Sequence, residues 1–207
     1  MSSSLEKYWE SLEDSTSLKT SDEAKFDYIS TYTNKHFHFM SPSEDEVCIE
    51  DIAQALSNLC RFSGHVKEFY SVAEHSIILA DYVMDKYGNA DMALTALLHD
   101  ASEAYIVDVP RPIKPYLTNY QDIEGGISKV INNVFKVHPM CDVIKDLDHN
   151  IVCDEAKVLF KSVPDWVQYY KEVGVTLRMY TPEEAREAFM SKFEELIYAR
   201  KSQEVFE

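Results

Sequence analysis

The chain has no long hydrophobic run and no closely spaced pair of cysteines. No uninterrupted apolar stretch in its 207 residues approaches the roughly 20 residues that a membrane span needs. The opening segment MSSSLEKYWESLEDS has none of the apolar character of a secretory signal. The 4 cysteines form no CxxC motif, which excludes a zinc ribbon and is typical of reduced thiols. We therefore expect a cytoplasmic protein without membrane contacts.

Basic residues are also scarce. The sequence has 20 lysines and arginines against 36 aspartates and glutamates, which gives a formal net charge of −16 at pH 7. This excess of acid argues against nucleic acid as a partner, because phosphate backbones select basic surfaces. A small anionic substrate is still compatible with the composition, provided that the few basic residues gather in a local pocket.

Most of the chain has the periodicity of helices. Apolar residues recur at helical spacing over six stretches: 49–62, 71–88, 90–105, 118–135, 142–160 and 181–201. A chain of 207 residues suits one domain with a substantial core. We expect a mainly α, single-domain helical bundle with a small N-terminal β-hairpin. Residues 1–32 are expected to form a polar, partly helical extension, and residues 33–207 the domain itself.

Local signals mark the hairpin and several helix ends. The HFHF run at 36–39 alternates with period two and is expected to pair with residues 47–49. Capping boxes are expected at Ser71 and Thr118, and a Thr-Pro helix start at Thr181. A GG pair lies inside the helix expected over 118–135. Each glycine costs about 1 kcal/mol in a helix interior, so the pair predicts close packing there.

An acidic and histidine-rich cluster follows one of the most apolar helices. His99, Asp100 and Glu103 crowd one edge of this helix if it continues through them. Burying such groups costs several kcal/mol unless they are paired. An imidazole beside a carboxylate is a preferred ligand pair for divalent transition metals. Completing the coordination requires partners from other helices, and His75 and Asp148 are available.

Three segments carry a resemblance to a known family: NLCRFSGHVKEFYSVAEHS, LLHDASEAYIVDVPRPIKP and IKDLDHNIVCDEA. They resemble the HD-domain superfamily of phosphohydrolases. The similarity is closest to the branch of prophage and phage 5'-deoxynucleotidases and deoxynucleoside triphosphohydrolases of the dATPase type. It extends over about residues 33–160 and implies an HD-type helical bundle.

The resemblance also implies roles for individual residues. It implies four metal ligands: His75, His99, Asp100 and Asp148. It implies that Glu103 and Asp108 orient or deprotonate the attacking water. It implies contacts with substrate, mostly its phosphate, by Arg61, His65, Lys114 and Arg111. Phe62 stands where some of these nucleotidases have a tryptophan near the sugar.

The expected activity is hydrolysis of the 5'-phosphate ester of a deoxynucleotide by water attack on the α-phosphorus. The expected cofactor is one divalent metal ion, with Mn, Co, Zn, Fe, Ni and Mg as candidates. Products are deoxynucleoside plus phosphate from a monophosphate, or deoxynucleoside plus triphosphate from a dNTP such as dATP. The resemblance also implies a homo-oligomer, a dimer or larger.

Other interpretations of the same residues are open. The chain could be a phosphodiesterase for a cyclic nucleotide or alarmone, or a catalytically silent nucleotide-binding module. His99 and Asp100 could form a simple hydrogen-bonded pair at a helix end. Arg61 could pair with Glu50 or Asp51. Three further acids compete with Asp148 for the ligand position: Asp142, Asp146 and Asp154.

Overall fold

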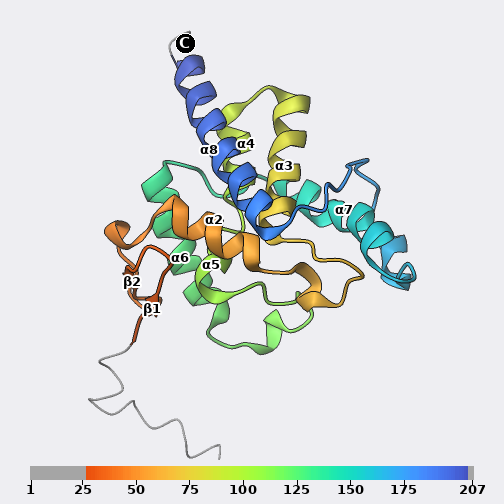
Figure 1. The fold of residues 1–207 in the computed structure, drawn as a ribbon, viewed down its shortest axis with the longest axis horizontal. Helices are drawn as coiled ribbons and strands as arrows, with labels where there is room; N and C mark the ends of the chain where they lie inside the picture. The colour runs from red at the N-terminus through yellow and green to blue at the C-terminus, as the bar shows by residue number, and fades with distance from the viewer. Residues whose placement is uncertain (1–26, 205–207) are drawn as a thin grey trace, which may run out of the picture.

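The computed structural model describes residues 27–204, which are mainly helical, as the sequence predicts (Figure 1). The α-helices are α2 (Ile49–Asn58), α3 (Val72–Tyr87), α4 (Ala90–Leu97), α5 (Glu103–Ile106), α6 (Tyr120–Phe135), α7 (Asp142–Leu159) and α8 (Pro182–Glu204). The shorter 3-10 helices are η2 (Glu44–Glu46), η3 (Arg61–Gly64), η4 (Lys114–Tyr116) and η5 (Asp165–Tyr169). Most of the predicted extension lies outside the described residues. Within the described part, no helix is long and apolar enough to cross a membrane.

A small antiparallel hairpin is present near the N-terminus, but its strands are not the predicted pair. Strand β2 (His36–Phe37) pairs with β1 (Ile29–Ser30), which precedes it in the chain. The prediction of a return strand at 47–49 is wrong, because η2 ends at Glu46 and α2 already begins at Ile49, which leaves only two residues between them. The backbone N–H of His38 donates to the Glu46 carboxylate at 3.0 Å, so a side chain takes the bond that a returning strand would make.

Helix α3 lies at the centre of the core. It packs against α2, α4, α7 and α8, and α8 also packs against α2 and α4 (Figure 1). Its predicted end residues are confirmed: the Ser71 hydroxyl accepts the backbone N–H of Glu74, and Gly88 ends the helix in the left-handed conformation. The expected capping box is only half formed, because the Glu74 carboxylate accepts backbone N–H groups of residues 178–180 instead of that of Ser71. The fully buried residues of this core include Phe37, Ile52, Leu56, Leu79, Leu94, Leu97, Ile127 and Phe189.

A buried carboxylate joins α3 to the start of α8. Glu74 is fully buried and accepts the backbone N–H groups of Arg178, Met179 and Tyr180 at 2.6 to 2.8 Å. These bonds satisfy a segment that has no regular secondary structure. Thr181 then caps α8 as predicted, because its hydroxyl accepts the N–H of Glu184. The segment is therefore held against α3 by a side chain rather than by a sheet.

The helix expected over 90–105 is interrupted, which corrects the continuous face proposed for His99 and Glu103. Helix α4 ends at Leu97 and α5 begins at Glu103. The carbonyl of Ala96, which would accept the N–H of Asp100 in a continuous helix, instead accepts Nδ1–H of His99 at 2.7 Å. The chain then continues with tighter bonds, such as Glu103 N–H to Asp100 O at 2.9 Å. A side chain therefore ends the helix.

The start of α6 and its glycines also differ from the prediction. The helix begins at Tyr120, so Thr118 is not its cap. A Cβ added at Gly125 or Gly126 would meet no atom within 4 Å, so the expected close packing at these glycines is wrong. Both residues are exposed in the helix interior. They therefore cost helix stability without a packing benefit.

We expect the substitutions Gly125→Ala and Gly126→Ala each to raise the free energy of unfolding by about 1 kcal/mol, because alanine restricts the unfolded chain and meets no steric obstacle. Urea denaturation followed by circular dichroism measures the change. Gly88→Ala is the matched control: it should destabilise, since Gly88 has a φ of 62°. A loss of stability at both Gly125 and Gly126 would show that these positions need glycine.

Candidate metal centre

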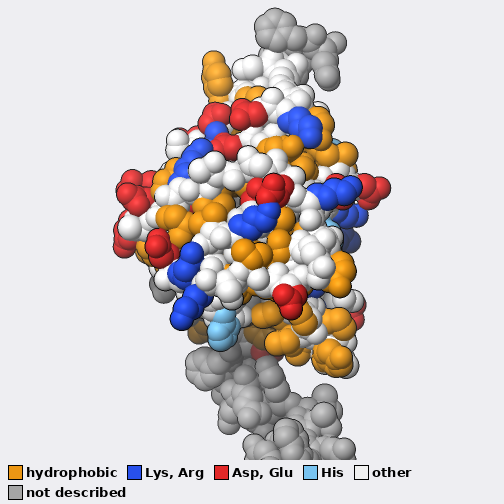
Figure 2. Space-filling model, turned by 90° about the vertical axis from the view of Figure 1, so that its right-hand side faces the viewer, with side chains coloured by type: hydrophobic (Ala, Val, Ile, Leu, Met, Phe, Trp, Pro, Cys, Tyr) orange, Lys and Arg blue, Asp and Glu red, His pale blue; other side chains and the backbone are white. Residues whose placement is uncertain are grey.

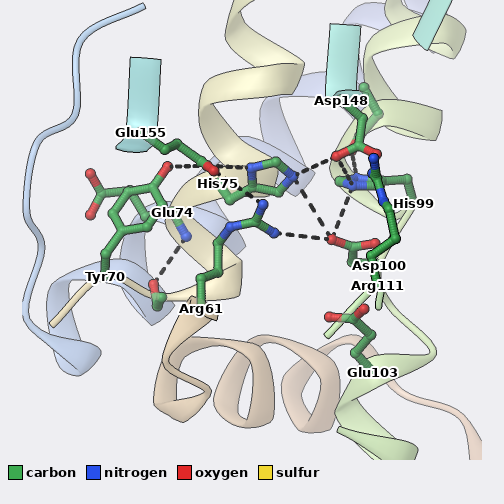
Figure 3. Close-up of polar contacts among 12 residues, drawn as sticks. Arg61, Tyr70, Glu74, His75, His99, Asp100, Glu103, Arg111, Asp148 and Glu155 are labelled. Atoms are coloured by element: carbon green, nitrogen blue, oxygen red, sulfur yellow. Dashed lines mark hydrogen bonds and ion pairs between the residues drawn. The ribbon is translucent and has the colours of Figure 1, made fainter. Parts of the chain in front are cut away.

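Three elements bring the four predicted ligands together (Figure 3). His75 comes from α3, His99 and Asp100 from the turn between α4 and α5, and Asp148 from α7. Asp148 Oδ1 lies 3.1 Å from His75 Nε2 and 3.6 Å from His99 Nε2. Asp100 Oδ2 lies 3.0 Å from His99 Nε2 and 3.9 Å from His75 Nε2. The group formed by His75, His99 and Asp148 could hold a metal ion.

Both imidazoles are oriented by a hydrogen bond at the opposite ring nitrogen. His75 Nδ1–H donates to Glu155 Oε1 at 2.6 Å, and His99 Nδ1–H donates to the Ala96 carbonyl at 2.7 Å. A carbonyl oxygen can only accept, so the proton of His99 is placed on Nδ1. Each ring therefore presents Nε2 to the cluster. Protein-bound metals depend on such outer partners to hold the ligating tautomer.

The pKa values of the predicted ligands are shifted in opposite directions, upward for the histidines and downward for the aspartates. Burial lowers the pKa of His99, but the carboxylates of Asp100 and Asp148 outweigh it and raise that pKa well above 6.5. Burial raises the pKa of Asp148, but its hydrogen bond with His75 and the nearby charges of His99 and His75 bring it well below 3.8. The pKa of Asp100 is lowered because the attraction of His99 outweighs burial. Protonated imidazoles and ionised aspartates therefore stabilise one another in this cluster.

The donor set fits a divalent cation. Nε2 of His99 is buried and makes no hydrogen bond, although the Asp100 carboxylate is 3.0 Å away. Two imidazole nitrogens and two carboxylates form a mixed ligand set that transition metals prefer. A divalent cation bound there would balance the two aspartates in place of imidazole protons. The competing acids Asp142 and Asp146 are exposed. Asp154 accepts backbone N–H groups of Val173 and Gly174 instead.

Glu155 is a site residue that the sequence analysis missed. It is fully buried and contacts three side chains: His75 at 2.6 Å, Tyr70 at 3.0 Å and Arg61 at 3.1 Å. Burial raises the pKa of Glu155, but Arg61 and His75 outweigh it and lower the pKa to about 2. Glu155 follows Asp148 by seven residues on α7, which is two helical turns on one face. This spacing on one face of α7 could have identified Glu155 from the sequence.

The two predicted water-activating acids lie beside the ligands. Glu103 is 5% exposed, and its Oε2 is buried without a hydrogen-bond partner. Burial, together with the charges of Asp100 and Asp108, raises the pKa of Glu103 to about 10. Burial also raises the pKa of Asp108, against the opposing charge of Arg61. Both carboxyls therefore hold protons more tightly than exposed acids do.

The predicted substrate-binding residues occupy different environments. Arg61 is buried, with ion pairs to Glu155 and to Asp100 at 3.7 Å, so the proposed pairs with Glu50 or Asp51 are not formed. Asp51 instead accepts from Thr33 and Cys48. Arg61 therefore points into the cluster of predicted ligands.

Lys114 and Arg111 lie at the edge of the cluster. Lys114 Nζ is 2.9 Å from Glu124 and 3.9 Å from Glu103. Arg111 Nη2 is 4.0 Å from Asp148 Oδ2.

Figure 2 views the side of the molecule on which α7 lies in Figure 1. There, lysines and arginines are dispersed among acidic and hydrophobic side chains.

The other two predicted substrate-binding residues are His65 and Phe62. His65 is exposed on the segment after η3. Phe62 makes an edge contact with Phe160, with ring centroids 5.2 Å apart, and lies under the Arg61 guanidinium. Its backbone has a φ of 54°. The structure therefore uses Phe62 partly to pack η3 against the end of α7.

A separate cavity of about 170 Å³ borders the turn that carries His99. It is lined by residues of α4, α6 and the following segments, among them Ser102, Ser128, Asn132 and His138. It has room for a ring-sized group but not for a whole nucleotide.

Comparisons with known proteins give relatives but no function. No family model matches the chain. The chain is 40% identical to the uncharacterized protein YfdR of Escherichia coli K12 over 113 residues, which are 55% of this chain and 61% of YfdR. It is 25% identical to the uncharacterized protein RCAP_rcc00048 of Rhodobacter capsulatus over 187 residues, which are 80% of this chain and 93% of that protein. The chain therefore matches less than two thirds of the length of YfdR.

Proposed function

We propose that this protein is a metal-dependent phosphohydrolase of the HD-domain type that cleaves the 5'-phosphate ester of deoxynucleotides. One observation carries the proposal: two imidazoles and two carboxylates from three separate segments converge, with a buried arginine against them. A simple helix-end pair of His99 and Asp100 would not need the additional groups from α3 and α7.

Three of the proposed ligands are His75, His99 and Asp148, whose ligand atoms lie close enough to share one ion. Asp100 is the proposed fourth ligand, with its carboxylate 3.0 Å from His99 Nε2, and Glu155 would hold His75 in place. A divalent ion bound there would supply an acidified water and positive charge against the phosphoryl oxygens. The chain's own contribution begins with Arg61. Its guanidinium is fixed by Glu155 and faces the ligand cluster, where a planar fork suits the oxygens of a phosphate.

Glu103 is the proposed proton acceptor. In the metal-free protein its pKa of about 10 keeps it protonated at neutral pH. Positive charge beside the carboxyl lowers that pKa, so the group becomes able to take a proton from water. Asp108 and Lys114 adjust the same carboxyl, because Asp108 raises the pKa of Glu103 and Lys114 lowers it. Glu103 is therefore placed to exchange a proton within the site.

The first test is turnover. Purified protein supplied with each candidate divalent ion should release phosphate from a deoxynucleoside monophosphate or triphosphate from a dNTP. His99→Ala and Asp100→Ala should each lower kcat/KM on the order of 1000-fold, because loss of a ligand removes several kcal/mol of transition-state stabilisation. The matched control is His36→Ala, since His36 is exposed on strand β2 and is none of the proposed site residues.

Three results would contradict this assignment. Unchanged turnover in His99→Ala with metal present would remove the catalytic role of the cluster. Release of a 5'-monophosphate from a cyclic nucleotide would favour a phosphodiesterase. Binding of nucleotide without turnover under any of the ions would favour a silent module.

The second test concerns Glu155. We expect Glu155→Gln to weaken metal binding by about 10- to 100-fold, because the amide is a weaker partner for His75 Nδ1–H than the carboxylate. Metal affinity is measured by competition with a chromophoric chelator, with circular dichroism to verify folding. Glu194→Gln on the exposed face of α8 is the control and should bind metal normally. Equal affinity in both variants would remove Glu155 from the site.

The third test is the pH dependence of metal binding. The raised pKa values of His75 and His99 mean that the metal-free protein holds protons that bound metal must displace. Affinity should therefore rise with pH, by about tenfold per unit for each proton displaced, between about pH 6 and about pH 7.5. Calorimetry in buffers with different ionisation enthalpies counts the protons released. An affinity that is constant over this range would contradict ligation by these imidazoles.

A further inference from the structure

The cavity of about 170 Å³ beside the turn that carries His99 has both apolar and polar walls. Its apolar wall is formed by Leu98 and Ile131, which are buried, together with Pro139 and Met140. Its polar residues come from α4, the turn after it, α6 and the segment that follows α6: Thr95, His99, Ser102, Ser128, Asn132 and His138. His138 and Pro139 are exposed, so the segment after α6 forms the rim of the cavity.

Four polar side chains on this wall have unused hydrogen-bonding groups. Ser102 precedes α5, but its hydroxyl makes no capping bond, although the residue is only 4% exposed. Among the residues that the structure describes, no hydrogen bond involves the side chain of Ser128, Asn132 or His138. Thr95 differs, because its hydroxyl donates to a backbone carbonyl of α4 at 2.9 Å. Polar groups that are nearly buried without partners are costly, so the cavity favours an occupant that forms hydrogen bonds.

The charge and volume of the cavity restrict the chemistry of that occupant. None of the described residues that line it is a lysine, arginine, aspartate or glutamate. An ionised ligand would therefore lose its hydration without gaining a counter-charge. An apolar cavity of about 150 Å³ accommodates one benzene ring. Hydroxyl and amide groups can donate and accept, so a single uncharged ring with N–H and C=O groups on its edge matches both walls.

His99 connects this cavity to the proposed metal centre, because it belongs to the walls of both. Its Nδ1–H donates to the Ala96 carbonyl at 2.7 Å, and its Nε2 lies 3.6 Å from Asp148 Oδ1. Ser102 directly precedes Glu103, so the same turn carries a cavity residue and the proposed proton acceptor. A ligand packed in the cavity would restrict movement of the His99 ring and favour the orientation that presents Nε2 to a metal.

We infer that the cavity binds a small uncharged heterocycle of single-ring size, and that its occupancy strengthens metal binding through His99. The first half stands on the cavity alone, whereas the second half rests on the proposed metal centre. Coupling between two binding sites is reciprocal, so bound metal must tighten binding of the heterocycle by the same factor.

An NMR titration with uracil as the probe tests the site, because uracil carries N–H and C=O groups on one six-membered ring. We expect a Kd on the order of 1 mM for a ligand of this size. Asn132→Leu and Ser102→Ala should each weaken binding by about 3- to 10-fold, as expected for the loss of one neutral hydrogen bond. Asn133→Leu, at the exposed next position of α6, is the matched control and should bind uracil normally. Circular dichroism verifies that each variant is folded.

The coupling is measured by repeating the uracil titration with saturating Mn²⁺, which should lower the Kd for uracil by about fivefold. An unchanged Kd in the presence of bound Mn²⁺ would overturn the link through His99. No binding of uracil, or equally tight binding of benzene, would overturn the site, since water or any apolar ring would then fill the cavity. Equal weakening by Asn132→Leu and Asn133→Leu would place uracil elsewhere. Binding of uracil by a protein that binds no Mn²⁺ would refute the proposed metal centre and leave the heterocycle site standing.

Discussion

The contact between Glu155 and His75 is the interaction on which the rest of the site depends. Glu155 is fully buried, and the charges of Arg61 and His75 lower its pKa to about 2, which favours the ionised form. A buried charge without partners costs several kcal/mol, so Arg61, Tyr70 and His75 must all stay in contact with it. The same carboxylate thus fixes the tautomer of a proposed ligand and the position of the proposed phosphate-binding arginine.

Sequence patterns predicted the elements whose signals are local. The Ser71 cap, the Gly88 end and the Thr181 start are short-range features, and the structure has them. Two predictions, the continuous helix over 90–105 and the return strand at 47–49, were wrong because a side chain takes a backbone hydrogen-bonding group. His99 takes the carbonyl that would extend α4, and Glu46 takes an N–H that a returning strand would use. Apolar periodicity contains no information about either bond.

The residues of the site differ in whether sequence patterns alone could identify them. The four proposed ligands stand out as residue types that are costly to bury, and the packing of α3 against α4 and α7 brings them together. Glu155 could have been found from its two-turn spacing after Asp148. The contact of Arg111 with His149 could not, because it depends on how the segment after α5 folds back beside α7. That path is a property of tertiary packing.

Backbone conformation gives an independent reason to regard this region as more than a scaffold. Phe62 and Ser63 have φ values of 54° and 51°, and Val107 has a φ of 63°; each costs about 1–3 kcal/mol in a non-glycine residue. The first two directly follow Arg61, and Val107 directly precedes Asp108. Positive φ also occurs at Asn34, at the helix end Lys136 and at Met179. Three of the six non-glycine positions with positive φ among the described residues therefore adjoin Arg61 or Asp108, where the strain helps to direct charged side chains into the cluster.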